Sequence, residues 1–381
     1  MQSSRPTPHT ASTLQIATGT CHVILAYDVG FAIDLTACEQ HLTALTQRAT
    51  IKHKHRAPTY FEYRPAPVRV IQEAKPLPLG SYYSNPSVEL VVYDFGVISL
   101  TYQIPLGGPF SSLLALHNDL YANTLLRQDA HRQVTRLVTI IAGAMARPHM
   151  TDMVEDYVIF QIETLTMPYR AEALIQQYAQ DIAQLLRGES QTLSEQEVRD
   201  ALACQIAFGL DDVAIIDWNA AFLFDREAED VRAVLEFANV ELLEMRYLDE
   251  QLDNDLDQAY EALSKHNWHG FRLPGSSRTD LRRIAQMQVD SAMLFEGVNN
   301  ALKLLGDQYL ARVYRLASQR FHLEEWDASI LRKLQILEGI YEKIADRAAS
   351  RRLEILEWIV IVLITVSIIL PFFANLPWHP G

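Results

Sequence analysis

The sequence predicts an α+β protein: a ferredoxin-like α/β head with insertions, followed by a long antiparallel helical stalk and a single C-terminal transmembrane helix. Three observations lead to this fold class. Strand-like apolar runs alternate with helical patterns up to residue 225, a three- and four-residue apolar spacing follows, and no Asp, Glu, Lys or Arg occurs after Trp358. The predicted parts are a disordered tail (1–20), the head (21–225), the helical hairpin (226–352), the membrane anchor (353–376) and a short translocated tail (377–381).

The head is predicted from the order of its elements. The run "CHVILAYDV" is typical of a strand, and "LTACEQHLTALTQRA" has the apolar spacing of a helix. Two further strands meet within "VELVVYDFGVISLTYQI", a helical stretch covers Ser111 to Ala146, and "DYVIFQIETL" indicates another strand. Strand, helix, two strands, helix and strand is the order of a ferredoxin-like unit. A second hairpin is expected in "DVAIIDWNAAFLFD".

The stalk is predicted from apolar seams after Arg226. The first seam contains Val231, Leu235, Ala238, Leu242, Met245, Leu252, Leu256, Ala259 and Leu263. The Gly- and Pro-containing segment "HNWHGFRLPGSS" separates it from a second seam between Leu281 and Leu316, and a third begins near Trp326. Such seams favour helices packed on other helices, either as an antiparallel stalk or as an ordinary helical domain. They also allow a homo-oligomer.

The C-terminal segment is predicted to span a membrane. A bilayer core of ~30 Å needs about 20 mostly apolar residues. The anchor residues are Trp358, Ile359, Leu363, Ile368 and Trp378, with the two tryptophans at the interfaces. The basic residues Arg347, Arg351 and Arg352 precede the span and none follows it. The positive-inside rule therefore predicts a single-pass, tail-anchored protein with a cytoplasmic head, in a bacterial inner membrane or, as the alternative, a mitochondrial one.

The composition excludes some classes of function. A net charge of -14 argues against a broad nucleic-acid surface, because phosphate binding depends on clustered Lys and Arg. The three cysteines, Cys21, Cys38 and Cys204, form no CxxC pair, which favours a reducing compartment. The first twenty residues have no apolar segment of the kind that a secretory signal contains.

The sequence contains no recognisable catalytic, cofactor or metal motif. The "YDFG" at residues 93–96 resembles the magnesium-binding motif of protein kinases, but the Gly-rich loop and the HRD loop are missing. We therefore interpret Asp94 and Gly96 as structural turn residues between two strands. His53 and His55 have the spacing of two metal ligands, but the basic residues between and beside them favour a solvated loop.

Two stretches, "VELVVYDFGVIS" and "RLEILEWIVIVLI", resemble the required-for-meiotic-nuclear-division family, also called domain of unknown function 155. The resemblance implies a membrane-attached protein without established catalytic residues. It also implies a ribosome as a partner, because mitochondrial members support translation by holding ribosomes near the membrane. The absence of a targeting presequence departs from those members.

Two functions follow as expectations. The first is a membrane-tethered scaffold, in which the head or the stalk binds a protein or a ribosome and the C-terminal helix contacts the lipid bilayer. The alternative is an enzyme with an unrecognised site in the α+β head. The acidic composition and the helical seams favour the scaffold over the enzyme, and no cofactor is expected.

Overall fold

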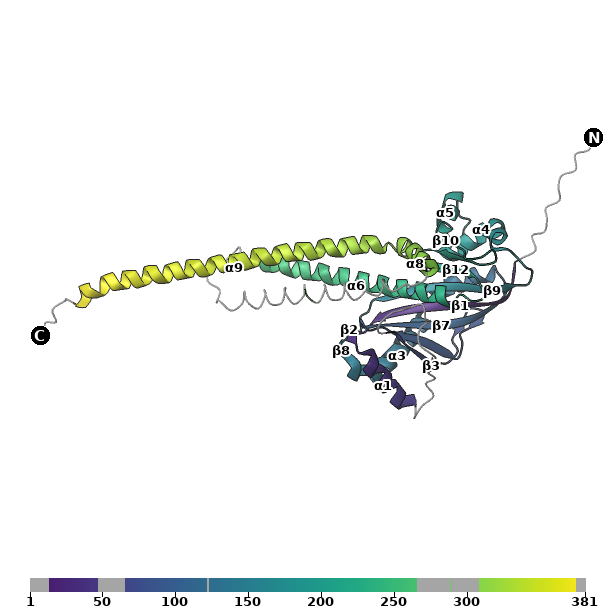
Figure 1. The fold of residues 1–381 in the computed structure, drawn as a ribbon, viewed down its shortest axis with the longest axis horizontal. Coiled ribbons are helices and arrows are strands. Elements are labelled where there is room, and N and C mark those ends of the chain that lie inside the picture. The colour runs from purple at the N-terminus through teal and green to yellow at the C-terminus, as the bar shows by residue number, and fades with distance from the viewer. Residues whose placement is uncertain (1–13, 47–65, 122, 266–288, 290–307, 375–381) are drawn as a thin grey trace, which may run out of the picture. The chain divides into compact units, whose positions relative to one another are not determined.

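The computed structural model describes residues 14–46, 66–121, 123–265, 289 and 308–374 (Figure 1). The chain divides into two compact units. The first consists of Met1–Tyr247 and Leu294–Asp327, and the second of Leu248–Met293 and Ala328–Gly381. The two units are described separately below.

The strands are β1 (Gln15–Asp28), β2 (Gly30–Ile33), β3 (Val68–Glu73), β4 (Pro78–Leu79), β5 (Tyr82–Tyr83), β6 (Ser87–Val92), β7 (Val97–Pro109), β8 (Met145–Pro148), β9 (Val154–Leu165), β10 (Gln205–Ile206), β11 (Val213–Ile216) and β12 (Ala220–Phe224). The helices are α1 (Leu35–Thr46), α2 (Ser112–Tyr121), α3 (Thr124–Ile141), α4 (Ala171–Arg187), α5 (Glu195–Ala201), α6 (Glu229–Lys265), α8 (Gln308–Arg320) and α9 (Leu323–Ala374).

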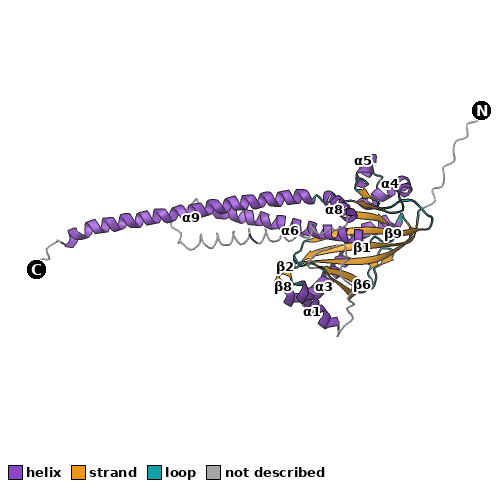
Figure 2. Cartoon of the chain, in the orientation of Figure 1, coloured by secondary structure: helices purple, strands orange, loops and turns teal. Residues whose placement is uncertain are grey.

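The first unit is built on an eight-stranded mixed sheet with the order β10-β11-β12-β9-β1-β7-β6-β3. Neighbouring strands are antiparallel except β12 and β9, which run parallel. Figure 2 shows the strands of the sheet in orange. The order β9-β1-β7-β6 at the centre is that of a βαββαβ unit. The hairpin β11–β12 extends this unit beyond β9, β10 follows at that edge, and β3 extends it beyond β6.

Both faces of the sheet are buried, which explains the nearly continuous apolar run in β1. Cys21, Val23 and Leu25 face the core that includes residues of α1 to α4. Ile24 faces the opposite core, to which α6 and α8 contribute (Figure 1). A strand that is covered on both faces does not need to alternate apolar and polar residues. The sheet is therefore the middle layer between two helical layers.

The predicted helical stretch from Ser111 to Ala146 is divided between α2 and α3. Asn123 is the N-cap of α3, and its Oδ1 accepts a hydrogen bond from the backbone N–H of Leu126 at 2.9 Å. An asparagine in this position satisfies a backbone donor that the first turn of a helix leaves unpaired. The break places α2 and α3 separately on the sheet, and the buried residues of both helices belong to the same core.

The structure contradicts the predicted fold class. The central four strands have the predicted order, but the sheet is extended to eight strands and has helices on both faces. Among the described residues, no helix is long and apolar enough to be the predicted transmembrane helix. The seam residues Val231, Leu235 and Leu242 pack with residues of the sheet and of α8. The apolar spacing correctly predicted a helix, but it did not predict that this helix packs on the sheet. A helix that packs on a sheet and a helix that packs on other helices both need an apolar stripe.

In the second unit, α6 and α9 pack against each other over their described residues. Leu252, Ala259, Ile330, Leu337 and Ile340 are buried. Asp249 accepts a hydrogen bond from Ser329 at 3.1 Å, and Lys333 Nζ lies 2.6 Å from Asp253 Oδ1. Successive turns of α6 thus contact successive turns of α9 in the same order, so these two helices run parallel. Most of the predicted second seam, including Leu302, lies outside the described residues.

The predicted transmembrane helix is also contradicted. Among the described residues, no helix is both long enough and apolar enough to cross a membrane. This finding overturns the predicted tail-anchored, single-pass localisation in a bacterial or mitochondrial inner membrane.

The residues assigned to that anchor are distributed as follows. Trp358, Ile359 and Leu363 belong to α9 and are exposed. Ile368 and the basic residues Arg347, Arg351 and Arg352 also belong to α9, but their side chains lie outside the described part, as does all of Trp378.

Candidate functional site

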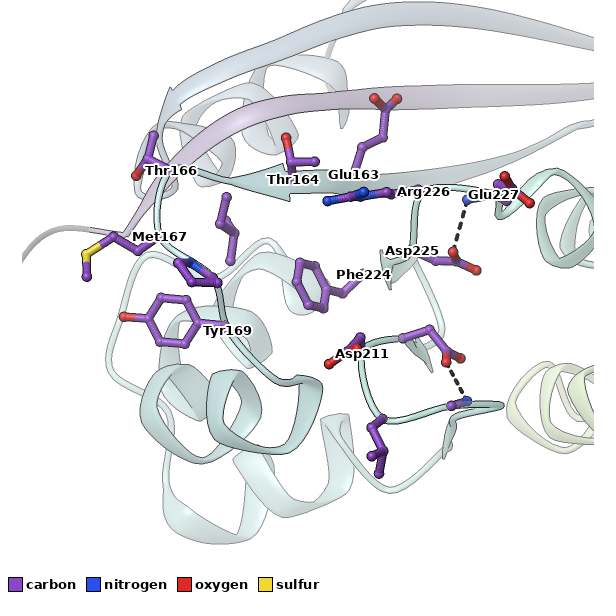
Figure 3. A pocket seen from close by; sticks show the side chains of 15 residues that line it. Glu163, Thr164, Thr166, Met167, Tyr169, Asp211, Phe224, Asp225, Arg226 and Glu227 are labelled. Atoms are coloured by element: carbon purple, nitrogen blue, oxygen red, sulfur yellow. Dashed lines mark hydrogen bonds between the residues drawn. The ribbon is translucent and has the colours of Figure 1, made fainter.

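An acidic groove of about 790 Å³ in the first unit is the strongest candidate for a functional site. Three segments form it: residues 163–169 after the middle of β9, the loop 209–212 before β11, and residues 224–227 between β12 and α6 (Figure 3). A pocket of this volume is large enough for a small molecule or a short peptide segment. We call this feature the groove.

Backbone hydrogen bonds to carboxylates shape two of the three segments. Asp212 Oδ2 accepts a hydrogen bond from the backbone N–H of Phe208 at 2.7 Å and thereby closes the loop before β11. Asp225 Oδ1 accepts one from the backbone N–H of Glu227 at 3.0 Å where the chain leaves β12 (Figure 3). Short polar side chains stabilise turns in this way. The parallel pairing of β12 with β9 brings these segments to the same end of the sheet.

The charged residues that line the groove are predominantly acidic. It includes the carboxylates of Glu163, Asp211, Asp212, Asp225 and Glu227 and a single basic residue, Arg226. Among the described residues, no ion pair within 4.0 Å neutralises any of these five carboxylates. The groove therefore presents negative charge to a ligand.

Apolar side chains complete the lining. Met167 is 61% exposed and Leu210 is 71% exposed, although both are large and apolar. Phe224, by contrast, is almost buried, and the ring of Tyr169 packs edge-on against Tyr178. Exposed apolar side chains at the rim of a concave site are typical of binding surfaces. The groove thus combines negative charge with an unfilled apolar contact area.

The comparison with known proteins identifies the family. The model of the family described as "Uncharacterized protein MJ0711, N-terminal domain" matches residues 18–230, more than half of the chain. The chain belongs to this family. It is also 23% identical over 219 residues to the uncharacterized protein MJ0711 of Methanocaldococcus jannaschii, an alignment that covers 57% of this chain and 65% of that protein. No solved structure matches the chain.

The family match corrects the resemblance inferred from the sequence. The matching family is the MJ0711 N-terminal domain family, and the required-for-meiotic-nuclear-division family is not found, so the earlier assignment is wrong. Short stretches such as "YDFG" carried that resemblance, and turn motifs of this kind recur in unrelated proteins. The match to the MJ0711 N-terminal domain family includes every residue that lines the groove and ends shortly after α6 begins.

The structure places Asp94 and Gly96 in the tight connection between β6 and β7. Gly96 has a φ of +96°. Its carbonyl accepts a hydrogen bond from Val29 N at 2.9 Å, and the Asp94 carbonyl accepts one from Ile33 N at 2.7 Å. The connection thus packs against the end of β1, on segments other than those that form the groove.

A repeated motif, missed in the sequence analysis, underlies this packing. Residues 27–30 read Tyr-Asp-Val-Gly and residues 93–96 read Tyr-Asp-Phe-Gly. The second glycine of the pair approaches the backbone of the first so closely that a Cβ on Gly96 would lie 1.6 Å from the carbonyl oxygen of Gly30. The repetition of Tyr-Asp-x-Gly was the signal in the sequence, because backbone groups of the two segments pair with each other, as in the hydrogen bond from Val29 N to the Gly96 carbonyl.

Near this pair, His149 links three elements. Its Nε2 lies 3.1 Å from Asp28 Oδ1, its Nδ1 lies 3.1 Å from the Arg147 carbonyl, and its ring stacks on that of Tyr247. The hydrogen bond to Asp28 raises the pKa of His149 above its ordinary value. Because both ring nitrogens are engaged, we interpret His149 as a structural tie between β1, β8 and α6 rather than as a catalytic base.

The described residues show little sign of metal or thiol chemistry. Among them, no group of three or more His, Cys, Asp or Glu side chains is arranged to hold a metal ion. Burial raises the pKa of the Cys38 thiol to about 12 and also raises that of Cys21, which disfavours the reactive thiolate form. His53 and His55 lie outside the described residues.

The buried carboxyl groups of α6 predict a pH dependence of stability. Burial raises the pKa of Glu241 to about 8, while Tyr314 donates a 2.6 Å hydrogen bond to its Oε2. The folded protein retains this proton, whereas the unfolded chain loses it near pH 4.5. Stability should therefore fall as the pH rises from about 4.5 to about 8, by about 3 kcal/mol at pH 7 for this group.

The substitution Glu241→Gln tests this expectation, because glutamine imitates the protonated acid and its carbonyl can accept the bond from Tyr314. Urea unfolding at several pH values should show a flatter profile and greater stability at pH 8 than in the parent chain. Glu250→Gln, at an exposed position of the same helix, should leave the profile unchanged. An identical pH profile in Glu241→Gln and the parent chain would contradict the buried, protonated state of Glu241.

Proposed function

We propose that this protein is an interaction scaffold and that its groove binds a segment of a partner protein. The observation that carries the proposal is that two exposed apolar side chains, Met167 and Leu210, line a groove with a volume of about 790 Å³. Apolar side chains at the rim of a concavity gain favourable free energy when a partner removes them from water, at roughly 25 cal/mol per Å². Exposed apolar side chains do not stabilise the fold of the free protein, so a role in binding explains their exposure better than a role in stability.

The chemistry of the lining supports binding rather than catalysis. Glu163, Asp211 and Glu227 lie on different segments, and none of them is placed with a histidine, cysteine or serine among the residues that line the groove. A serine or cysteine nucleophile needs a general base within hydrogen-bond reach, and the lining contains no such pair. The same carboxylates are well suited to bind a cationic side chain.

Site-specific photocrosslinking tests the proposal. A photoreactive residue is introduced at Leu210 of the full chain. The control chain carries it at Tyr83, which is 64% exposed, against 71% for Leu210, but lies on β5, outside the groove lining. In the cells that naturally produce the chain, we expect a protein that crosslinks from Leu210 and not from Tyr83. The captured protein, once purified, should bind the parent chain and should bind Leu210→Asp at least ~10-fold more weakly.

The crosslinking experiment at Leu210 and Tyr83 can also contradict the proposal. Crosslinked products that are identical at Leu210 and Tyr83, or a captured protein that binds Leu210→Asp as tightly as the parent chain, would show that the groove is not the interaction surface.

A further inference from the structure

We infer that the groove takes an extended, basic partner segment in which Lys or Arg residues alternate with aliphatic residues. This inference rests on the proposed function and specifies the chemistry of the occupant. The argument depends on which side chains line the groove, how they are already bonded, and how they are spaced.

The charge of the lining selects a cationic ligand. Five carboxylates and one arginine line the groove, so an acidic segment or a nucleic-acid phosphate would be repelled. Asp212 and Asp225 already accept backbone hydrogen bonds, whereas Asp211 and Glu227 are exposed on separate segments. These two carboxylates can pair with two separate cations of one ligand, which favours a chain that carries repeated positive charges over a single small cation.

The apolar part of the lining selects aliphatic side chains between those charges. Figure 3 shows Phe224 inside the groove, with Tyr169 and Asp211 on other segments around it. Met167 and Leu210 belong to this lining, and both are largely exposed. In an extended chain, successive side chains point in opposite directions, so a Lys-Leu alternation can direct cations to the carboxylates and aliphatic groups to Met167 and Leu210.

Defined peptides test the inference on the full chain. Fluorescence anisotropy is measured with the labelled peptides KLKGKLK, ELEGELE and KSKGKSK. We expect KLKGKLK to bind at least ~10-fold more tightly than the charge-reversed peptide and than the peptide that lacks leucine. Its affinity should fall when NaCl is raised from about 100 mM to about 500 mM, because the carboxylates are solvated and therefore screened.

Matched variants locate the binding. Asp211→Asn combined with Glu227→Gln removes two exposed charges from the groove and should weaken KLKGKLK binding by roughly 5-fold or more. Asp152→Asn combined with Glu189→Gln removes two exposed charges elsewhere in the first unit and should leave binding unchanged. Equal weakening by both pairs, or tight binding of ELEGELE, would overturn the inference.

The outcomes separate this inference from the proposed function. A partner captured at Leu210 whose binding segment is acidic or uncharged would preserve the scaffold function and refute the basic occupant. Groove-dependent binding of KLKGKLK, together with a failure of Leu210 to capture any protein, would preserve the chemistry of the occupant and refute the scaffold function.

Discussion

Replacement of Gly96 by alanine is expected to prevent the first unit from folding stably. The added Cβ would lie 1.6 Å from the Gly30 carbonyl oxygen and 2.7 Å from the Gly30 carbonyl carbon, and both atoms belong to backbone that cannot rotate away. The clash displaces the end of β1, which is also held by the hydrogen bond from Val29 to Gly96. We expect a loss of more than about 4 kcal/mol, measured by urea unfolding.

Gly108→Ala is the matched control for this prediction. Gly108 has a φ of +91°, almost the same as Gly96, but no heavy atom lies within 4 Å of its added Cβ. This variant therefore reports only the strain of an L-residue at positive φ, about 1 kcal/mol. Equal stability losses in Gly96→Ala and Gly108→Ala would show that the two Tyr-Asp-x-Gly segments are not in close contact.

The second large effect is expected at Asp217, which lies between two arginines. Its side chain is fully buried, its Oδ2 lies 2.6 Å from Arg187 Nε, and its Oδ1 bonds the guanidinium of Arg320. These contacts join the end of α4 and α8 to the turn between β11 and β12. Asp217→Ala leaves two partly buried guanidinium groups without this partner, so we expect a loss of about 3 kcal/mol in urea unfolding.

Asp200→Ala provides the comparison, because Asp200 binds the same two arginines from a more exposed position. Its side chain is 54% exposed, against 0% for Asp217. An exposed ion pair contributes little, so we expect a loss of less than about 1 kcal/mol. If Asp217→Ala were as stable as Asp200→Ala, the buried carboxylate would not be holding α8 on the sheet.

The local patterns of the sequence predicted most elements of the first unit but not how they pair. The apolar runs around Val23 and Ile159 indicate strands because each has the length and composition of one. The parallel pairing of β12 with β9 depends on contacts between residues about sixty positions apart, such as Phe160 and Phe222. Hydrophobic periodicity contains no information about which strand will be the neighbour.

The groove could not be predicted from the sequence for the same reason. Glu163, Asp211 and Glu227 stand on three segments that come together only after β12 has paired with β9. Each is an ordinary surface acid when considered alone, and no spacing along the chain links them. The Tyr-Asp-x-Gly repeat, by contrast, was visible in the sequence and would have indicated that the two segments belong together.

The central claim, that a partner segment occupies the groove, is tested most directly by amide hydrogen exchange of the full chain with and without KLKGKLK. We expect slower exchange in residues 163–169, 209–212 and 224–227 and unchanged exchange in residues 78–83, because a bound segment shields the backbone that surrounds it. Unchanged exchange in the three groove segments, with slower exchange elsewhere in the chain, would contradict the account.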